Sequence, residues 1–251
     1  MPLAGSLDIR SLLDGAPTVT LDAPDLRIDD VDILQVLYET RADDVGALLP
    51  PALNPTIPPV ISFLVYRAKE SAFGPFALAQ LRLIARAAVR PRAFLVSARC
   101  DNEAVAGALA QSWGFRIEPG TIRLRRFHDR VECSVVAERN PILEVALVDP
   151  LPVTGSDIQY APGMHLARVT NDEGTAPRLV QVDTEYEFRR ADRGRPDLRT
   201  YDATAWGDER LVALQPVSAS FTACDVTVGA VRYVCNPDIP ASEGTERVGG
   251  S

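Results

Sequence analysis

Lysine is almost absent from this sequence, which has 251 residues, 25 arginines and a single lysine, Lys69. Only one side-chain amine is therefore available for covalent chemistry on a carbonyl group. Lys69 lies in a polar stretch, YRAKESAFG, and lysines of this kind are nearly always solvated. We expect Lys69 to be a surface residue, and we do not expect chemistry that uses a buried side-chain amine.

Cysteine and histidine are also scarce. No two cysteines have C-x-x-C spacing, and neither histidine has a metal-ligand or triad partner nearby in the sequence. The residues concerned are Cys100, Cys133, Cys224, Cys235, His128 and His165. We therefore expect no metal. Reduced, mostly buried thiols in a cytoplasmic protein are the interpretation that we favour, with a Cys224–Cys235 disulfide as the alternative.

Several longer patterns are missing as well. No apolar run is long enough to span a bilayer, and the N-terminus lacks a basic start followed by a long apolar run, so we expect neither a membrane span nor a secretory signal. Glycine-rich nucleotide loops and the G-x-S-x-G pattern of hydrolases are absent, so we expect no cofactor. The net charge of −8 disfavours nucleic acid and anionic membranes as partners.

The sequence is rich in the alternation that is typical of strands. It is clearest in LVQVDTEYEF (179–188), where apolar and aromatic residues alternate with polar ones. In residues 121–136, two alternating runs predict a hairpin that turns near His128 and Asp129. The strands that we expect lie at residues 31–38, 60–66, 93–99, 121–136, 179–188 and 225–234.

Helical patterns are fewer. Residues 101–113 predict a helix that Asp101 or Asn102 could cap, and residues 42–50 predict a shorter one. Residues 77–89 fit either a helix or a strand. The chain is therefore predicted to be α+β and mainly antiparallel β. Residues 1–28 are interpreted as an N-terminal arm, 29–237 as one domain and 238–251 as a flexible tail.

The order of these segments resembles the acetoacetate decarboxylase family over roughly residues 30–237. The segments that carry the resemblance are LQVLYETRADDVGALLPPAL, ISFLVYRAKESAFGPFALAQ, AFLVSARCDNEAVAGALAQSWGFRIE, GMHLARVTNDEGTAPRLVQV and VTVGAVRYV. The resemblance implies a closed, cone-like antiparallel β-barrel with a few outer helices, and a homo-oligomer.

The resemblance also implies a lysine that attacks a ketone, beside a second lysine that lowers its pKa. This sequence departs from the pattern at each catalytic position. Ile117 matches the nucleophile, Glu118 its neighbour and Arg116 the preceding proline. Two family glutamates match Leu78 and Phe63, and Val31 matches the family's arginine. The family's lysine chemistry is therefore not expected here.

The replacements fit two hypotheses. In the first, the pocket is refitted for a larger, mostly apolar molecule that bears a carbonyl group, such as a polyketide-like intermediate, and the protein promotes dehydration, isomerisation or cyclisation by positioning. In the second, the pocket is packed shut, and the protein is a non-catalytic binding or scaffolding relative. An open cavity favours the first hypothesis, and a filled one favours the second.

Candidate site residues follow from these positions. Alternation from Leu78 places Phe76 and Gln80 on its face. A carboxylate beside apolar walls, such as Glu118, can act as an acid or base, although a surface ion pair with Arg116 is the competing interpretation. The candidate catalytic residues are Glu118, Arg116 and Gln80. The candidate substrate-binding residues are Val31, Phe63, Phe76, Leu78, Ser97, Trp113 and Ile117. We expect Phe63, Leu78, Gln80 and Ile117 to converge on one internal cavity.

Overall fold

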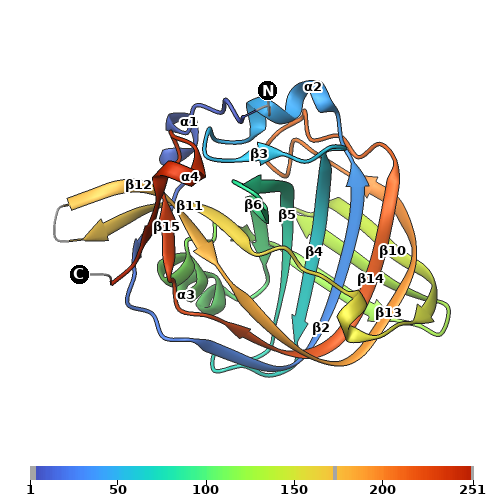
Figure 1. Cartoon of the computed structure of the whole chain (residues 1–251). Coiled ribbons are helices and arrows are strands. Elements are labelled where there is room, and N and C mark those ends of the chain that lie inside the picture. Colours follow the sequence, from blue (N-terminus) through green and yellow to red (C-terminus); the bar gives the residue numbers. More distant parts are fainter. Residues whose placement is uncertain (1–3, 172–173, 250–251) are drawn as a thin grey trace.

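Strands make up most of the fold in the computed structural model, which describes residues 4–171 and 174–249. The described residues form one large, strongly curved sheet (Figure 1). Its strands are β1 (Thr18–Thr20), β2 (Leu26–Glu39), β3 (Asn54–Pro55), β4 (Val60–Ala68), β5 (Phe76–Ala87), β6 (Arg90–Cys100), β7 (Ile117–Pro119), β8 (Thr121–Arg126), β9 (Arg130–Ala137), β10 (Asn140–Pro152), β11 (Gly163–Asn171), β12 (Gly174–Val182), β13 (Thr184–Tyr201), β14 (Pro216–Val228), β15 (Tyr233–Cys235) and β16 (Thr245–Arg247).

Helices are short, apart from one. They are α1 (Arg10–Leu13), α2 (Ala42–Val45), α3 (Glu103–Trp113) and α4 (Ala241–Gly244), with 3-10 turns η1 (Gly46–Leu48) and η2 (Gly155–Asp157). The Asn102 side chain caps α3 by accepting hydrogen bonds from the backbone N–H groups of Ala104 and Val105, at 3.0 and 3.2 Å. Gly114 ends the helix with φ 69°, a conformation that glycine adopts readily.

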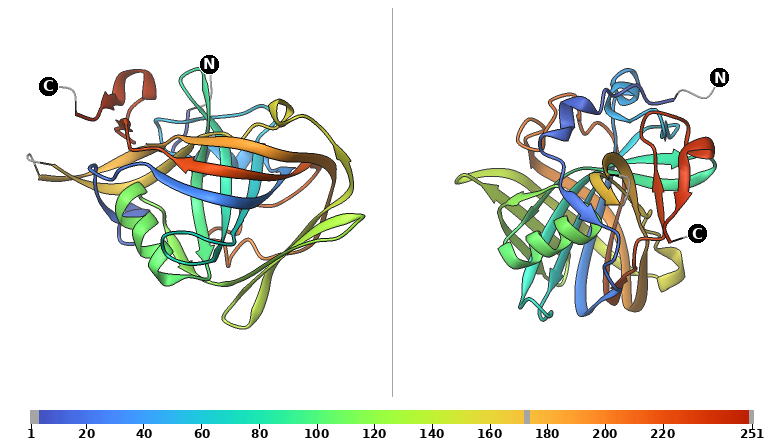
Figure 2. Two further views of the ribbon diagram at one scale, coloured as in Figure 1. Left: turned by 90° about the horizontal axis from the view of Figure 1, so that it is seen from below. Right: turned by 90° about the vertical axis from the view of Figure 1, so that its left-hand side faces the viewer.

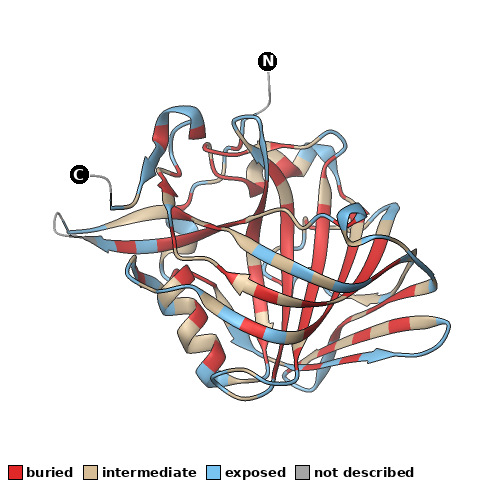
Figure 3. Cartoon of the chain, turned by 60° about the horizontal axis from the view of Figure 1, so that its bottom comes forward, coloured by how far each residue is buried: buried red, intermediate tan, exposed pale blue. Residues whose placement is uncertain are grey.

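The central strands lie in the order β6, β5, β4, β2 and β14, and both faces of this part of the sheet are covered. One face, called the α3 face, packs against α3, β1 and parts of β11 and β12. The opposite face packs against strands β8, β9 and β10 and is called the β8–β10 face. The two views of Figure 2 show α3 beside the sheet, and Figure 3 shows buried residues running along the central strands. The fold therefore has two apolar cores that share one sheet.

A closed barrel is not confirmed. In the described ranges the main path of paired strands runs from β16 to β8, and these two end strands do not pair with each other. Most neighbouring strands are antiparallel, as expected, but β11 and β7 each pair with β6 in parallel. Closure depends on pairing between segments that are distant in the sequence, and alternation within one strand carries no information on it.

Some expected elements have different limits. Residues 77–89 lie in strand β5 and the turn that follows it, so the helical alternative is wrong. The strand expected at 179–188 is divided at Asp183 into β12 and β13. The strand expected at 225–234 is divided into the end of β14 and the start of β15. Residues 241–247 form α4 and β16, although a flexible tail was expected there.

The N-terminal residues take part in the sheet as well. Strand β1 pairs with β11 in parallel, and β2 begins at Leu26, inside the stretch interpreted as an arm. All four cysteines are buried free thiols, so the Cys224–Cys235 disulfide is not formed. Among the described residues, no helix combines the length and the apolar character that crossing a membrane requires.

Candidate functional site

Strand β5 carries unusual polar residues on the α3 face of the sheet. Because side chains alternate along a strand, Leu78, Gln80 and Arg82 point to the same side. On the neighbouring strand β4, Leu64 lies opposite Gln80 and Ser62 lies opposite Arg82. All five side chains are buried. This face therefore combines an apolar wall with a carboxamide, a hydroxyl and a guanidinium group.

Arg82 is the most unusual of these residues. Its side chain is only 4% exposed, and one guanidinium nitrogen donates a hydrogen bond to the carbonyl oxygen of Ala161. Its Nε atom and the Ser62 hydroxyl are both buried without a hydrogen-bond partner. No carboxylate within the described residues forms an ion pair with Arg82. Burial lowers the pKa of the guanidinium group, yet arginine stays charged in proteins. A buried, unpaired cation is costly.

Tyr66 and Tyr186 lie close to this cation, and Tyr160 lies beside Tyr186. The hydroxyl groups of Tyr66 and Tyr186 are 2.9 Å apart, and the Tyr160 hydroxyl lies 2.9 Å from that of Thr222. The rings of Tyr160 and Tyr186 are 4.8 Å apart. Burial raises the pKa of each of the three phenols. The tyrosines are therefore neutral near pH 7, and they are hydrogen-bond donors rather than counter-ions for Arg82.

The aromatic part of the cluster is not fully enclosed. Tyr160, Tyr186 and Phe188 are only partly buried, so solvent still reaches their surfaces. The rings of Tyr186 and Phe188 are stacked, with centroids 5.9 Å apart. The polar end of the cluster thus has accessible aromatic surface beside it.

His165, in strand β11, lies on the same face and contacts the last residue of α3. Its Nδ1 atom is 2.9 Å from the carbonyl oxygen of Trp113, so Nδ1 carries the proton and donates it. The Phe115 ring packs edge-on against the imidazole, with centroids 4.2 Å apart. Burial, with a smaller contribution from the charge of Arg82, lowers the pKa of His165 to about 3, although the hydrogen bond to Trp113 acts in the opposite direction. The imidazole is therefore neutral in the native state at ordinary pH.

This shift predicts how stability depends on pH. The folded-state pKa of His165 lies below its unfolded value of 6.5, so the unfolded chain binds one more proton between these values. Stability is therefore complete above pH 6.5 and falls by about 1.4 kcal/mol per pH unit on acidification towards pH 3. We expect His165→Asn to remove this part of the slope in urea unfolding measured from pH 7 to pH 4.5.

The second histidine provides the control for that experiment. His128 lies in the exposed turn between β8 and β9, and His128→Asn is expected to leave the slope unchanged. An identical slope in wild type and His165→Asn would show that the imidazole is not held neutral by the fold.

Most candidate residues named from the sequence lie on the α3 face. Val31, Phe76, Leu78 and Trp113 are buried in its core, and Ile117 packs against it. Gln80 lies on this face too, as alternation from Leu78 predicted. The Trp113 indole Nε1–H donates a hydrogen bond to the carbonyl oxygen of Gly229 at 2.8 Å, which fixes the end of α3 against the sheet.

The expected position of Phe63 is wrong. Phe63 pairs with Leu81 across β4 and β5, and Tyr66 pairs with Leu78. Phe63 therefore points to the β8–β10 face, away from Leu78 and Gln80. There it is fully buried, and its ring centroid lies 4.9 Å from that of Tyr201. The expected convergence of Phe63 with Leu78, Gln80 and Ile117 on one cavity does not occur.

Ser97, Arg116 and Glu118 also lie away from the α3 face. They line a cavity of about 280 Å³ on the opposite side of β6, below the N-terminal segment and residues 204–211. Glu118 forms an ion pair with Arg99 at 2.5 Å, and its side chain is 53% exposed. Glu118 thus forms a surface ion pair, as the competing interpretation held, but its partner is Arg99 and not Arg116.

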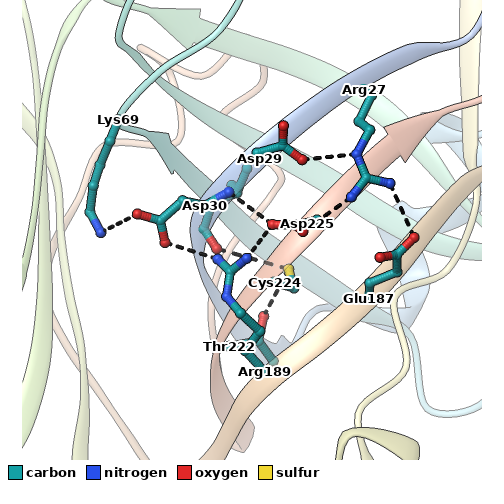
Figure 4. A network of polar contacts seen from close by, with 10 residues as sticks. Arg27, Asp29, Asp30, Lys69, Glu187, Arg189, Thr222, Cys224 and Asp225 are labelled. Carbon is teal, nitrogen blue, oxygen red and sulfur yellow. Dashed lines mark hydrogen bonds and ion pairs between the residues drawn. The ribbon is translucent and has the colours of Figure 1, made fainter.

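Lys69 is a surface residue, as expected. It follows strand β4, its side chain is 55% exposed, and its amine lies 2.6 Å from a carboxylate oxygen of Asp30. Figure 4 shows this pair at the edge of an ionic network in which Arg189 contacts both Asp30 and Asp225. An exposed, ion-paired amine is not placed to act as a nucleophile on a buried ketone.

The sequence contains a signal for Arg82. Once residues 77–89 are taken as a strand, the alternation that places Gln80 on the face of Leu78 places Arg82 there as well. The tyrosines carried no such signal, because Tyr66, Tyr160 and Tyr186 come from three separate segments. Within the described residues, no cluster of three or more His, Cys, Asp or Glu residues could hold a metal.

Comparison with known structures identifies the fold. The structure resembles acetoacetate decarboxylase from Legionella pneumophila subsp. pneumophila str. Philadelphia 1, with TM-score 0.71, 20% identity and coverage of 87% of this chain and 88% of that chain. It also resembles the enduracididine biosynthesis enzyme MppR complexed with pyruvate, with TM-score 0.66, 18% identity and coverage of 82% and 88%.

A further similar structure is an acetoacetate decarboxylase-like enzyme from Sphingomonas wittichii RW1, with TM-score 0.67, 13% identity and coverage of 84% and 92%. Comparison with curated protein sequences gave no significant match. The family model described as acetoacetate decarboxylase (ADC) matches residues 15–236, which is most of the chain. The chain therefore belongs to the acetoacetate decarboxylase family.

Proposed function

We propose that this protein is an enzyme of the family that works without a lysine, and that it binds a small oxo-carboxylate with an apolar tail on the α3 face. It would promote enolisation of the carbonyl group, with the α-proton passing to solvent, and this is the step shared by dehydration, isomerisation and cyclisation next to a carbonyl. The observation that carries the proposal is Arg82, a buried cation with no carboxylate partner among the described residues.

The charges of the cluster favour an anionic ligand. A ligand carboxylate would supply the negative charge that the surrounding protein does not give to Arg82, and arginine binds carboxylates with two parallel hydrogen bonds. The free Nε of Arg82 and the free hydroxyl of Ser62 are the unsatisfied groups nearest to that end. Buried polar groups normally have partners, so these two atoms mark where a ligand would complete the structure.

The spacing along β5 favours an elongated ligand. Phe76 and Arg82 lie six residues apart on one face of a strand, which corresponds to about 20 Å at 3.4 Å per residue. Phe76 and Leu78 form the apolar end, and Arg82 forms the charged end. A molecule with a carboxylate head and an apolar tail matches this gradient.

The tyrosines provide for the carbonyl group. The paired hydroxyls of Tyr66 and Tyr186 are neutral donors beside Arg82. Fixed donors in a site of low dielectric stabilise the oxygen of an enolate more than that of a ketone, because negative charge develops there. The similar enzyme MppR has been crystallised with pyruvate, and that is a small oxo acid of the class proposed here.

Hydrogen exchange provides the test. The protein is incubated in D₂O with acetoacetate or with longer 3-oxo acids such as 3-oxooctanoate, and loss of the α-proton signals is followed by ¹H NMR. We expect exchange faster than in buffer, faster for the longer acid, and no release of carbon dioxide above the spontaneous rate. Sodium borohydride is expected to leave the mass of the protein unchanged.

The result of this assay can also contradict the proposal. Protein-dependent release of carbon dioxide, with a borohydride adduct mapped to Lys69, would establish lysine chemistry instead. Exchange at the buffer rate for both acids would remove the catalytic proposal.

Non-catalytic binding is the alternative, and one observation favours it. The tyrosine hydroxyls and one arm of Arg82 already bond to other protein groups, as expected of a site that only holds a ligand. Saturable binding of 3-oxooctanoate, measured by calorimetry, with exchange at the buffer rate would support this alternative.

A further inference from the structure

A separate cavity on the β8–β10 face has the features of a second binding site. Its volume is about 280 Å³, close to the lower limit for small-molecule pockets. Its wall is largely apolar, and includes Phe94, Val96 and the fully buried Trp206. The N-terminal segment contributes Leu7 and Leu12 to the lining. The cavity therefore suits a ligand of fragment size with an apolar body.

Some polar groups of this cavity are incompletely paired. Ser97 is only 7% exposed, and its hydroxyl has no hydrogen-bond partner. The Nε atom of Arg99 is also buried without a partner, although its other nitrogens contact Glu118 and the carbonyl oxygen of Ala205. Unsatisfied buried donors at a cavity wall point to a missing acceptor.

One of the two cations that line the cavity has no carboxylate partner among the described residues. Arg99 is neutralised by Glu118, and Asp208 is neutralised by Arg210 at 2.6 Å. Arg116 forms no ion pair with any residue in the described ranges, and its guanidinium group lies against the backbone of Gly15. The cavity thus offers one unpaired cation, one free hydroxyl and an apolar wall.

We infer that this cavity binds a small aliphatic or aromatic carboxylate. Its carboxylate pairs with Arg116 and accepts a hydrogen bond from Ser97, and its apolar body lies against Phe94, Val96 and Trp206. The site is separate from the one that contains Arg82, because Ser97 lies opposite Leu81 on the β8–β10 face, whereas Arg82 lies on the α3 face.

The test uses octanoate and benzoate as probes and octanamide as the uncharged comparison, with binding measured by calorimetry on the full-length protein. We expect at least one of the two carboxylates to bind and octanamide to bind at least about tenfold more weakly. Arg116→Gln is expected to weaken carboxylate binding at least about tenfold, and Ser97→Ala by a smaller factor. Arg116→Lys keeps the charge and is expected to retain most of the binding.

Arg82→Met separates this site from the α3 face. Binding at the cavity is expected to be unchanged in this variant, and circular dichroism verifies that each variant is folded. The inference is overturned if neither carboxylate binds at millimolar concentration, if Arg116→Gln binds as wild type does, or if Arg82→Met abolishes the binding.

Discussion

Replacing Arg82 with methionine should abolish function while leaving the fold at least as stable as before. The variant removes the cation proposed to hold the ligand carboxylate, so α-proton exchange of 3-oxooctanoate should fall at least about a hundredfold, as expected when a charge-assisted bidentate contact is lost. Losing the hydrogen bond to the Ala161 carbonyl costs about 1 kcal/mol. Removing an unpaired buried charge offsets that cost, because apolar replacements of buried ions are often neutral or stabilising.

Arg67 provides the matched control. It pairs with Asp32, and its guanidinium also donates to the carbonyl oxygen of Leu124 at 2.5 Å. Arg67→Met leaves a largely buried carboxylate without its partner, so the free energy of unfolding should fall by about 1–3 kcal/mol while exchange stays near wild type. Urea unfolding and the NMR exchange assay measure both quantities. If Arg82→Met unfolds easily and retains exchange, Arg82 is a structural residue and the proposed function fails.

Phe63→Ala should cost about 3–5 kcal/mol of unfolding free energy, the largest effect on stability that we expect of a single substitution here. Phe63 is fully buried on the β8–β10 face, and its ring packs edge-on against those of Tyr38 and Tyr201. Truncation leaves a cavity that the surrounding strands cannot close without losing their pairing. Urea unfolding at pH 7 measures the loss.

Activity distinguishes a core residue from a site residue in this variant. Phe63 lies on the opposite face from Arg82, so exchange at a temperature well below the unfolding midpoint should change less than about twofold. Phe73→Ala is the control, because Phe73 is 40% exposed and its truncation should alter stability by less than about 0.5 kcal/mol. A large loss of exchange in Phe63→Ala with little loss of stability would return Phe63 to the substrate site.

The difference between Phe63 and Gln80 shows how much the sequence could predict. Gln80 and Leu78 belong to one strand, so their relative orientation follows from alternation alone. Phe63 and Leu78 belong to two strands, and their relative orientation depends on which residue of β4 faces which residue of β5. A change of one residue in that register reverses the answer. The family resemblance gave the order of the strands, but it did not give this register.

The same limit applies to the tyrosines and to closure of the sheet. The three tyrosines come from β4 (Tyr66), from the segment that precedes β11 (Tyr160) and from β13 (Tyr186), and they meet only because these parts come together in space. The hydrogen bond between Tyr66 and Tyr186 joins residues 120 positions apart. Helix α3, in contrast, was predicted almost at its true limits, since its cap and its ending are local features. Local chemistry could be predicted, and long-range register could not.

Strand β7 has a consequence for how this family can gain or lose reactions. It is three residues long, and it directs Ile117 to one core and Glu118 to the other side of the sheet. Deleting one residue from the segment that joins α3 to β7 would exchange these two positions. A carboxylate would then lie on the face of the sheet that carries Arg82, and an isoleucine would face the cavity on the other side. A single-codon deletion would thus exchange the groups that β7 presents to the two faces of the sheet.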